Sequence, residues 1–560
     1  MFDLYIVLRA PRRHLTLNSR DPAMAELSFT PGLYTTANSV HESFVGISVE
    51  WSRAQSYTKQ PAFSALMSHL SPRPNIRIGG NSADTSWWDP DNEGLNSTCS
   101  KSYNESVCCK YTITAEDIIA HQKCAEIING TLTLDLNLLD SSGEYAITEL
   151  EKIVDTVGLS HVDAFEIGNE PDLFYENGIR GPDYSLEDFT KEFDFVLNKL
   201  SKQDVKFQGG TFCCKSEFFQ GQSDIMATQK DLLSTWSYHR YPTSTCNGKN
   251  VSLAQLMSDE SAVGQANLVK NDVASAAANG LPFVIGESNS ASCSGQTNVS
   301  DTIASALWFL DYGMNLAAVN VSRVNLHGGG AAPYSWLGEF VEDSAAPDVR
   351  PLYYGMKMLA DFTKNNARIL KLDGAAVEMC HSGISTQGGV CCASSCGICG
   401  GDGCNDFPGG SSLCCAGVIE EAGRFCDATN SSDVGCLINP DSEELLKSWA
   451  VYDHLTNEFR VLIVNKNQED LGPKLVKIHV KNKEIKAQAM LHRLTGLTAD
   501  GFGARYNISI ASQTFDGSKE GELVGDLRLE SVMPFLADGT STFSVNIQSA
   551  QAAMLVIADK

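Results

Sequence analysis

The chain has 560 residues, of which 43% are hydrophobic, and its 42 basic and 68 acidic residues give a formal net charge of -26. This composition is typical of a globular protein large enough for more than one core. The acidic excess would repel a phosphate backbone, so nucleic-acid binding is not expected. No apolar run reaches the roughly 18 residues that a transmembrane helix needs, so none is predicted.

Residues 1–27 form a poorly defined N-terminal segment. Its apolar stretch Phe2–Leu8 is short and contains Asp3, which makes it a poor signal peptide. We therefore expect an incomplete or misassigned N-terminus.

Cysteines and glycosylation sequons nevertheless point to secretion. The 18 cysteines include four adjacent pairs, and ten of them lie between Cys380 and Cys436. Such density is typical of disulfides formed in an oxidising compartment. Asn-x-Ser/Thr sequons begin at Asn96, Asn104, Asn129, Asn250, Asn298, Asn320, Asn430 and Asn507. The sequence thus predicts a secreted protein that carries disulfides and N-glycans.

Short apolar runs alternate with amphipathic stretches over residues 28–366. Eight strands are expected at Phe44–Trp51, Asn75–Gly80, Leu132–Leu139, Ala164–Gly168, Lys206–Phe212, Ser234–Tyr241, Pro282–Gly286 and Arg323–His327. Helical spacing is clearest at Ala62–Leu70, Ala115–Ile128, Glu144–Val157, Ser185–Leu200, Asp301–Leu316 and Tyr353–Thr363. Eight strands, each followed by a helical stretch, predict a (β/α)₈ TIM barrel. The alternation by itself also fits a doubly wound sheet.

From residue 367 to 560 the pattern changes to strand-like segments. Trp449–Asn465 reads as a hairpin, and further strands are expected at Val476–Val480, Ala487–Arg493, Tyr506–Ile510 and Met554–Ile557. We therefore expect a C-terminal β-sandwich domain. The cysteine-rich residues 388–436 read as a disulfide-linked insertion in this domain.

Two glutamates carry the chemistry that the sequence predicts. Glu170 follows the fourth expected strand in FEIGNEPDLF, and Glu287 follows the seventh in FVIGESNSAS. In a (β/α)₈ barrel the carboxyl ends of the strands meet at one mouth, where the active site lies. One protonated and one ionised carboxyl group are what glycoside hydrolysis requires. We expect a separation of about 5–5.5 Å, the retaining geometry. Singly, Glu170 also reads as a helix N-terminal acid, and Glu287 as a solvated loop acid.

The motifs ISVEW, RIGGNSAD, FEIGNEPDLF, SYHRYP, VIGESNSA, LHGGGAAPY and RPLYYGMKML follow one another in this order. With Asn-Glu-Pro after the fourth strand, this set resembles glycoside hydrolase family 79, the β-glucuronidases and heparanase of clan A. The resemblance covers about Phe44 to Phe362 well and the C-terminal domain loosely. It implies a retaining β-glucuronidase that needs no cofactor and no metal.

The resemblance also implies roles for individual residues. Glu170 would be the acid/base and Glu287 the nucleophile that forms the glycosyl-enzyme. Asn169 would donate to the sugar 2-hydroxyl, Tyr241 would hydrogen-bond Glu287, and His239 would line the same wall. Further sugar contacts are implied for Glu50, Asn81 and Asp84, although Asp84 also reads as a loop cap.

Selection of a glucuronide would depend on its carboxylate. The resemblance suggests that backbone amides of the glycines after His327, Gly328 and Gly329 above all, hold this group together with Tyr334 and Tyr353. Glycines let a backbone approach an anion closely. Neutral donors of this kind would reconcile an acidic protein with an acidic sugar.

Other interpretations stay open. Another clan A retaining glycosidase, a xylosidase or an enzyme that cleaves within glycosaminoglycans, would lack the carboxylate pocket. A non-catalytic carbohydrate-binding protein would normally lack one of the glutamates. Cys396-x-x-Cys399 followed by Cys404 also allows a zinc knuckle, but no histidine lies between His381 and His454. No glycine-rich nucleotide fingerprint follows the first strand, so no nucleotide cofactor is implied.

Overall fold

The computed structural model of the chain describes residues 24–88, 107–200, 204–340, 347–373, 445–468 and 472–559. The cysteine-rich insertion at 388–436 and the sequons at Asn96, Asn104 and Asn430 lie outside these ranges. None of the described helices is long and apolar enough to cross a membrane.

Eight parallel strands close into a barrel in the order β10-β11-β2-β3-β6-β7-β8-β9. Each one matches a strand that the sequence predicts. Their bounds are β2 (Val45–Glu50), β3 (Asn75–Gly79), β6 (Thr131–Leu136), β7 (Val162–Ile167), β8 (Phe207–Phe212), β9 (Leu233–Arg240), β10 (Phe283–Ser288) and β11 (Val321–His327). Strands covered on both faces are apolar almost throughout, which is why periodicity alone did not separate this barrel from a doubly wound sheet. The closed order confirms the barrel.

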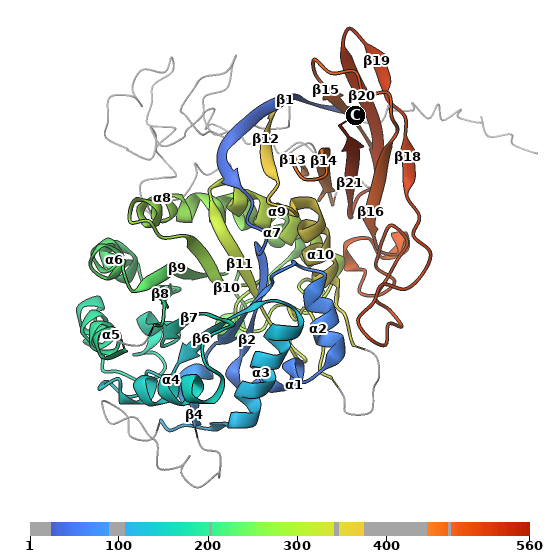
Figure 1. Cartoon of the computed structure of the whole chain (residues 1–560). Helices are drawn as coiled ribbons and strands as arrows, with labels where there is room; N and C mark the ends of the chain where they lie inside the picture. The colour runs from blue at the N-terminus through green and yellow to red at the C-terminus, as the bar shows by residue number, and fades with distance from the viewer. Residues whose placement is uncertain are drawn as a thin grey trace, which may run out of the picture.

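Helices surround the barrel (Figure 1). They are α1 (Trp51–Thr58), α2 (Pro61–Ser68), α3 (Ala115–Ile127), α4 (Glu144–Val157), α5 (Leu186–Leu200), α6 (Ser216–Gln229), α7 (Leu253–Met257), α8 (Gln265–Ala278), α9 (Ile303–Ala318) and α10 (Pro351–Thr363). A capping box of Thr114 and Asp117 fixes the start of α3, because each side chain accepts from the backbone of the other residue. The expected helices therefore lie where the sequence places them.

The remaining large sheet has 11 strands in the described part of the chain. Its members are β1 (Met24–Ser39), β12 (Arg368–Asp373), β13 (Leu446–Asp453), β14 (Glu458–Asn465), β15 (Lys474–Val480), β16 (Ala489–Thr495), β17 (Ser509–Ile510), β18 (Glu530–Val532), β19 (Phe535–Ala537), β20 (Thr540–Ile547) and β21 (Gln551–Ala558). The sheet curls around an apolar core of its own, which includes Phe29, Val461, Val476 and Phe543. The predicted β-sandwich is thereby confirmed.

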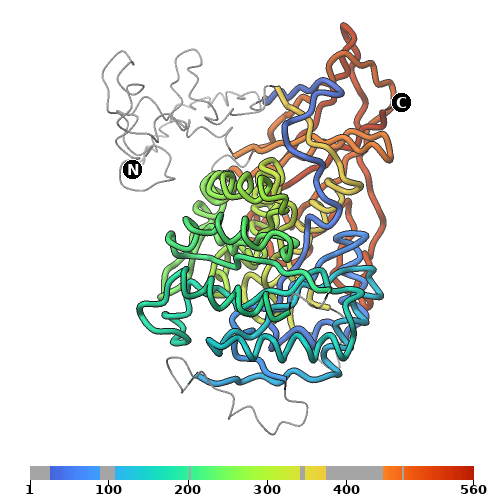
Figure 2. Tube along the Cα trace, turned by 60° about the vertical axis from the view of Figure 1, so that its left-hand side comes forward, coloured from blue at the N-terminus to red at the C-terminus, as the bar shows by residue number. Residues whose placement is uncertain are grey.

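The first strand of the described residues, β1, belongs to this β-domain. β1 pairs in parallel with β15 and antiparallel with β12, and Figure 2 shows the blue tube running into the orange and red domain. The expected boundaries placed residues 24–27 of this strand in the N-terminal segment and residues 28–39 in the barrel, so that assignment is wrong. The error has a physical reason: the partner β15 lies more than 400 residues further along the chain, and no local pattern encodes such pairing. A small parallel pair, β4 (Ser86–Trp88) and β5 (Tyr111–Ile113), was also not predicted.

Barrel and β-domain meet at α9 and α10 (Figure 1). α9 is buried along almost its whole length, because the barrel covers one side and the β-domain the other. A buried ion pair spans this junction: Lys466, which follows β14, contacts Asp311 of α9, and their side chains are 0% and 1% exposed. Asp311 also accepts a hydrogen bond from Asn315 at 2.8 Å.

This junction gives a stability prediction. Asp311→Ala leaves the Lys466 ammonium buried without a counter-charge, so the free energy of unfolding should fall by about 3–5 kcal/mol. The double variant Asp311→Leu/Lys466→Met removes both charges and should recover most of that loss. Chemical denaturation measures both. Equal destabilisation by the single and the double variant would contradict the assigned role of the ion pair.

Candidate active site

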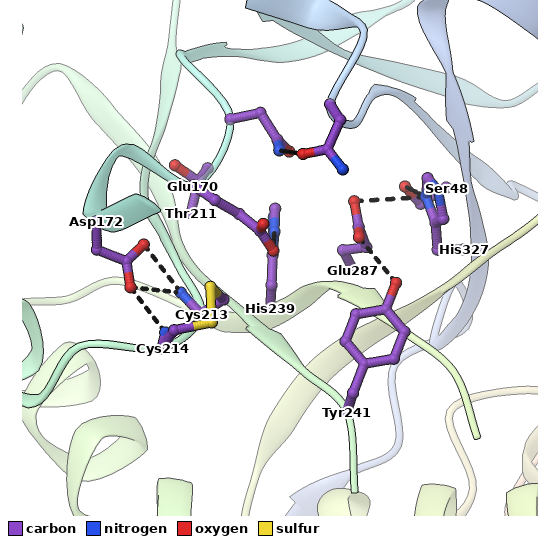
Figure 3. Close-up of polar contacts among 12 residues, drawn as sticks. Ser48, Glu170, Asp172, Thr211, Cys213, Cys214, His239, Tyr241, Glu287 and His327 are labelled. Atoms are coloured by element: carbon purple, nitrogen blue, oxygen red, sulfur yellow. Dashed lines mark hydrogen bonds and ion pairs between the residues drawn. A yellow bond between two sulfur atoms is a disulfide. The ribbon is translucent and has the colours of Figure 1, made fainter. Parts of the chain in front are cut away.

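Glu170 and Glu287 lie together at the carboxyl ends of two barrel strands, as predicted. Glu170 follows β7 and begins the short 3₁₀ helix η3 (Pro171–Leu173), and Glu287 is the next-to-last residue of β10. Figure 3 shows both side chains in one pocket with His239 of β9. A carboxylate oxygen of each glutamate and a ring nitrogen of His239 all lie within 4.8 Å of one another. This limit on one pair of oxygens is compatible with the predicted carboxyl separation of about 5–5.5 Å in retaining enzymes.

Glu287 is held as a carboxylate. Its Oε2 accepts a hydrogen bond from Arg77 Nη1 at 2.7 Å, and its Oε1 accepts one from the Tyr241 hydroxyl at 2.8 Å. His327 Nδ1 lies 3.4 Å from Oε2. Burial by itself would raise the pKa of Glu287, but the nearby His327, His239 and Arg77 and the Tyr241 hydrogen bond lower it to about 2. Glu287 is therefore ionised at neutral pH.

Glu170 has the opposite environment. Burial, the charge of Glu287 and then that of Asp172 raise the pKa of Glu170 well above its ordinary value. His239 Nδ1 lies 3.0 Å from Glu170 Oε1. Burial and the Arg77 charge lower the pKa of His239 to about 4, so this ring is neutral at neutral pH. The pKa values of the two glutamates are thus shifted in opposite directions although both side chains are buried.

Arg77 of β3 was not predicted as a site residue, yet it contacts more of the site than any predicted one. Its guanidinium donates to Glu166 at 2.6 Å, to Asp135 at 3.2 Å and to the Asn169 amide oxygen at 2.9 Å, in addition to Glu287. A sequence signal existed: Arg77, Asp135 and Glu166 each place a charge in a short strand next to buried apolar residues. A buried charge of this kind normally has a partner.

Several predicted sugar-binding residues lie around this pair. Glu50 at the end of β2 accepts from the Ser82 amide at 2.8 Å, and its Oε1 lies 3.6 Å from His327 Nε2. Asn169 donates to Asn81 Oδ1 at 3.3 Å. Burial lowers the pKa of His327, but the charges of Glu287 and Glu50 outweigh it and raise the value. His327 is thus a further site residue whose own role the sequence did not reveal.

Asp84 has a different role from the sugar contact that the resemblance implies. It is 3% exposed, and its two carboxylate oxygens accept the backbone N–H groups of Leu138 at 2.8 Å and Asn169 at 3.1 Å. These bonds hold the loop that carries Asn169. The alternative interpretation of Asp84 as a loop residue fits this geometry.

The predicted carboxylate pocket is largely wrong. The Gly328 amide donates to the Ser48 carbonyl at 3.0 Å, the Gly329 amide donates to the Ser335 hydroxyl at 3.1 Å, and the Gly330 amide donates to the Tyr57 hydroxyl. Because all three N–H groups already have protein partners, none is free for an anion.

The two tyrosines of that predicted pocket, Tyr353 and Tyr334, lie in different parts of the structure. Tyr353 of α10 is 0% exposed, its hydroxyl donates to the Leu66 carbonyl, and its ring packs on Phe515 of the β-domain, so it lies outside the site. Tyr334 stays at the mouth: burial and the charges of Glu287, Glu50 and Glu170 raise its pKa.

Two side-chain groups have the donor types that bind metal ions. Glu170, His239 and Glu287 form one, and Asp172, Cys213 and Cys214 form the other. In the first group Arg77 already neutralises Glu287. In the second the two sulfur atoms are joined in a disulfide. Atoms of both groups are therefore already bonded within the protein. The zinc-knuckle alternative concerns cysteines outside the described residues.

Comparisons with known proteins agree with this picture. No family model matches the chain. It is 24% identical over 338 residues to a β-glucuronidase of Aspergillus niger, matching 54% of this chain and 60% of that protein. It is 24% identical over 362 residues to a β-glucuronidase of Neurospora crassa, matching 58% and 64%. The chain thus spans 60% and 64% of the length of these two curated relatives.

Solved structures share the architecture. A 4-O-α-L-rhamnosyl-β-D-glucuronidase from Fusarium oxysporum superposes with a TM-score of 0.66 at 18% identity, over 95% of this chain and 100% of that one. A GH51 arabinofuranosidase from Xanthomonas axonopodis pv. citri superposes at 0.58 and 11% identity, over 95% and 99%. Together the comparisons show a (β/α)₈ barrel with a β-sandwich domain and support the predicted resemblance to the family 79 β-glucuronidases.

Proposed function

We propose that this chain is a retaining glycoside hydrolase that cleaves β-glucuronides from the end of a glycan or from an aryl aglycone. One observation carries the proposal: two buried glutamates have carboxylate oxygens within 4.8 Å of each other, in surroundings that raise the pKa of Glu170 and lower that of Glu287. A double displacement needs this pair, a carboxylate to attack and a carboxylic acid to assist departure.

The order of steps follows from the contacts. Glu287 attacks the anomeric carbon and forms an ester, while Glu170 gives its proton to the departing glycosidic oxygen. The ionised Glu170 then takes a proton from water, which hydrolyses the ester. Arg77 and Tyr241 hold the Glu287 oxygens before attack, so the nucleophile needs little reorganisation.

Two observations support a glucuronide as the substrate. The curated relatives are named β-glucuronidases, and Tyr334, whose ring centroid lies 6.1 Å from that of His327, has a neutral hydroxyl that can donate a hydrogen bond. A hydroxyl group can donate a hydrogen bond to the sugar carboxylate without adding a further charge to a site that already holds Glu50, Glu170 and Glu287.

A second candidate is a retaining glycosidase for a neutral sugar such as xylose. The amides of Gly328, Gly329 and Gly330 favour it, because all three are already bonded within the protein. The two candidates share the catalytic pair and differ only in whether the site binds the carboxylate that glucuronic acid carries on carbon 5 and xylose lacks.

We also propose that the protein is secreted and carries N-glycans. The disulfides Cys213–Cys214 and Cys246–Cys293 support an oxidising compartment. The sequon residues Asn129, Asn250 and Asn507 are exposed on the surface. A mass that falls after enzymatic removal of N-glycans from protein made in a eukaryotic host would support the assignment, and an unchanged mass would oppose it.

A substrate panel tests the activity. Purified protein should hydrolyse p-nitrophenyl β-glucuronide well above the corresponding β-glucoside and β-xyloside. Glu287→Gln should lower kcat by about 10⁴-fold or more, since the nucleophile is lost. Preference for a neutral sugar would replace the glucuronidase proposal by the second candidate. Turnover of none of the aryl glycosides or polysaccharide glucuronides would favour a binding protein.

The pH profile tests the two protonation states. As pH falls through the Glu287 pKa of about 2 the nucleophile is neutralised, and as pH rises through the raised pKa of Glu170 the acid is lost. Tyr241→Phe removes a hydrogen bond that lowers the Glu287 pKa, so the acidic limb of kcat/KM should move to higher pH while the basic limb stays.

Tyr353→Phe is the matched control for this experiment. It removes a tyrosine hydroxyl that bonds only the Leu66 carbonyl among the described residues, so neither limb should move. An acidic limb that is the same in Tyr241→Phe and in the wild type would contradict the assigned role of Tyr241.

A further inference from the structure

Two adjacent cysteines form a disulfide at the rim of the active site. Cys213 and Cys214 directly follow β8, and their sulfur atoms are bonded to each other (Figure 3). Cys214 is exposed. A disulfide between neighbouring residues closes a small ring that contains their peptide bond, so the backbone there has little freedom. The pairing was not foreseen, because adjacent cysteines normally pair with distant ones.

The backbone of this turn binds one carboxylate. Asp172 Oδ2 accepts the N–H groups of Cys214 at 2.7 Å and Lys215 at 2.9 Å, and the Cys213 N–H lies 3.3 Å from both carboxylate oxygens. Three consecutive N–H groups can converge on one side chain only if the turn keeps its shape. Asp172 is two residues beyond Glu170, so the disulfide turn is tied to the segment that carries the acid/base.

That segment has a backbone conformation that needs support. Glu170 lies in the left-handed region, with φ 50° and ψ 57°. This conformation is unfavourable for a residue that has a Cβ atom. On its other side, the Gly168 carbonyl accepts a hydrogen bond at 3.1 Å from the hydroxyl of Thr211, which itself has φ 60°. The segment at the end of β8 therefore hydrogen-bonds the chain on both sides of Glu170. It bonds Gly168, two residues before, and Asp172, two residues after.

The turn also bears on the charge at Glu170. The charged groups that face Glu170 are Glu287 from β10, Arg77 from β3, His327 from β11 and Asp172 from its own segment. Neutral His239 from β9 contacts it directly. Among these groups, Glu287 and Asp172 are the ones that favour the protonated acid, so Asp172 acts on Glu170 both through the backbone and through its charge.

We propose that Asp172 and the Cys213–Cys214 disulfide form a positioning unit for Glu170, which holds its left-handed turn and aims its carboxyl group at the leaving group. This inference rests on the proposed function, in which Glu170 is the acid/base. It assigns to the vicinal disulfide a role in proton delivery. Loosening the unit should impair departure of poor leaving groups and spare the attack by Glu287.

Leaving-group dependence separates these two effects. We would measure kcat/KM for aryl β-glucuronides that range from 2,4-dinitrophenol, which departs without a proton, to 4-methoxyphenol, which needs one. Asp172→Asn replaces one carboxylate oxygen, which accepts hydrogen bonds, by an NH₂ group, which donates them. Cys213→Ser/Cys214→Ser removes the ring that the disulfide closes. Both variants should lose at least about tenfold on the poor leaving group and less than about threefold on dinitrophenol. In Asp172→Asn the basic limb should also move to lower pH.

Cys246→Ser/Cys293→Ser is the matched control. It removes a disulfide that joins the segments after β9 and β10 without contacting Asp172, so the ratio between the two leaving groups should equal that of the wild type. Melting temperatures report whether each variant folds. If the Cys213/Cys214 variant does not fold, Asp172→Asn and its pH profile still decide the question.

The outcomes separate this inference from the proposed function. A wild type that cleaves glucuronides, with variants whose leaving-group ratio is unchanged, would overturn the positioning role alone. If the wild type prefers another aryl glycoside, the same series on that sugar tests the positioning role without the glucuronidase assignment. A wild type that cleaves no glycoside would overturn both.

Discussion

The active site depends on one buried guanidinium. Arg77 points into the barrel from β3 and faces carboxylates from three other strands, Asp135 of β6, Glu166 of β7 and Glu287 of β10. Its side chain is 0% exposed, and the surrounding acids raise its pKa further, so it stays charged. A buried cation without partners would cost several kcal/mol, and unpaired buried carboxylates would cost as much. The polar network at the barrel axis is therefore stable only as a set.

This constraint explains why two similar glutamates behave differently. Arg77 bonds Glu287 directly but does not bond Glu170, which instead contacts a neutral histidine. The positive charge thus lies beside Glu287, whereas burial and the charge of Glu287 raise the pKa of Glu170. A fold that places both on strand ends makes them neighbours, and the position of Arg77 gives their carboxyl groups different surroundings.

Much of this could be predicted from the sequence. The eight barrel strands follow from buried apolar runs, and Glu170 and Glu287 follow from their places just after two of them. The role of Arg77 was in principle readable, because strands of this kind tolerate a charge only when it is paired. The predicted resemblance added Asn169, Tyr241 and His239 to the site, and all three contact the catalytic pair or Arg77.

Other features depend on contacts that no local pattern encodes. Tyr353 was assigned to the sugar by the family resemblance, but in α10 its ring packs on Phe515 of the β-domain. The three glycine amides were treated as free, because their partners Ser48, Tyr57 and Ser335 are identified only by the folded chain. Likewise, β1 finds its partner β15 only when the β-domain is assembled.

The most direct test of the account is to trap the covalent intermediate. The protein would be incubated with a 2-deoxy-2-fluoro-β-glucuronyl fluoride and then digested for peptide mass spectrometry. The fluorine at carbon 2 slows both formation and hydrolysis of the glycosyl-enzyme, whereas the anomeric fluoride is a good leaving group. The account predicts one fluoroglucuronyl group per active protein, attached to Glu287, and hydrolysis of the ester accompanied by recovery of activity. Attachment to Glu170, or turnover of a glucuronide with inversion and without any labelled peptide, would contradict it.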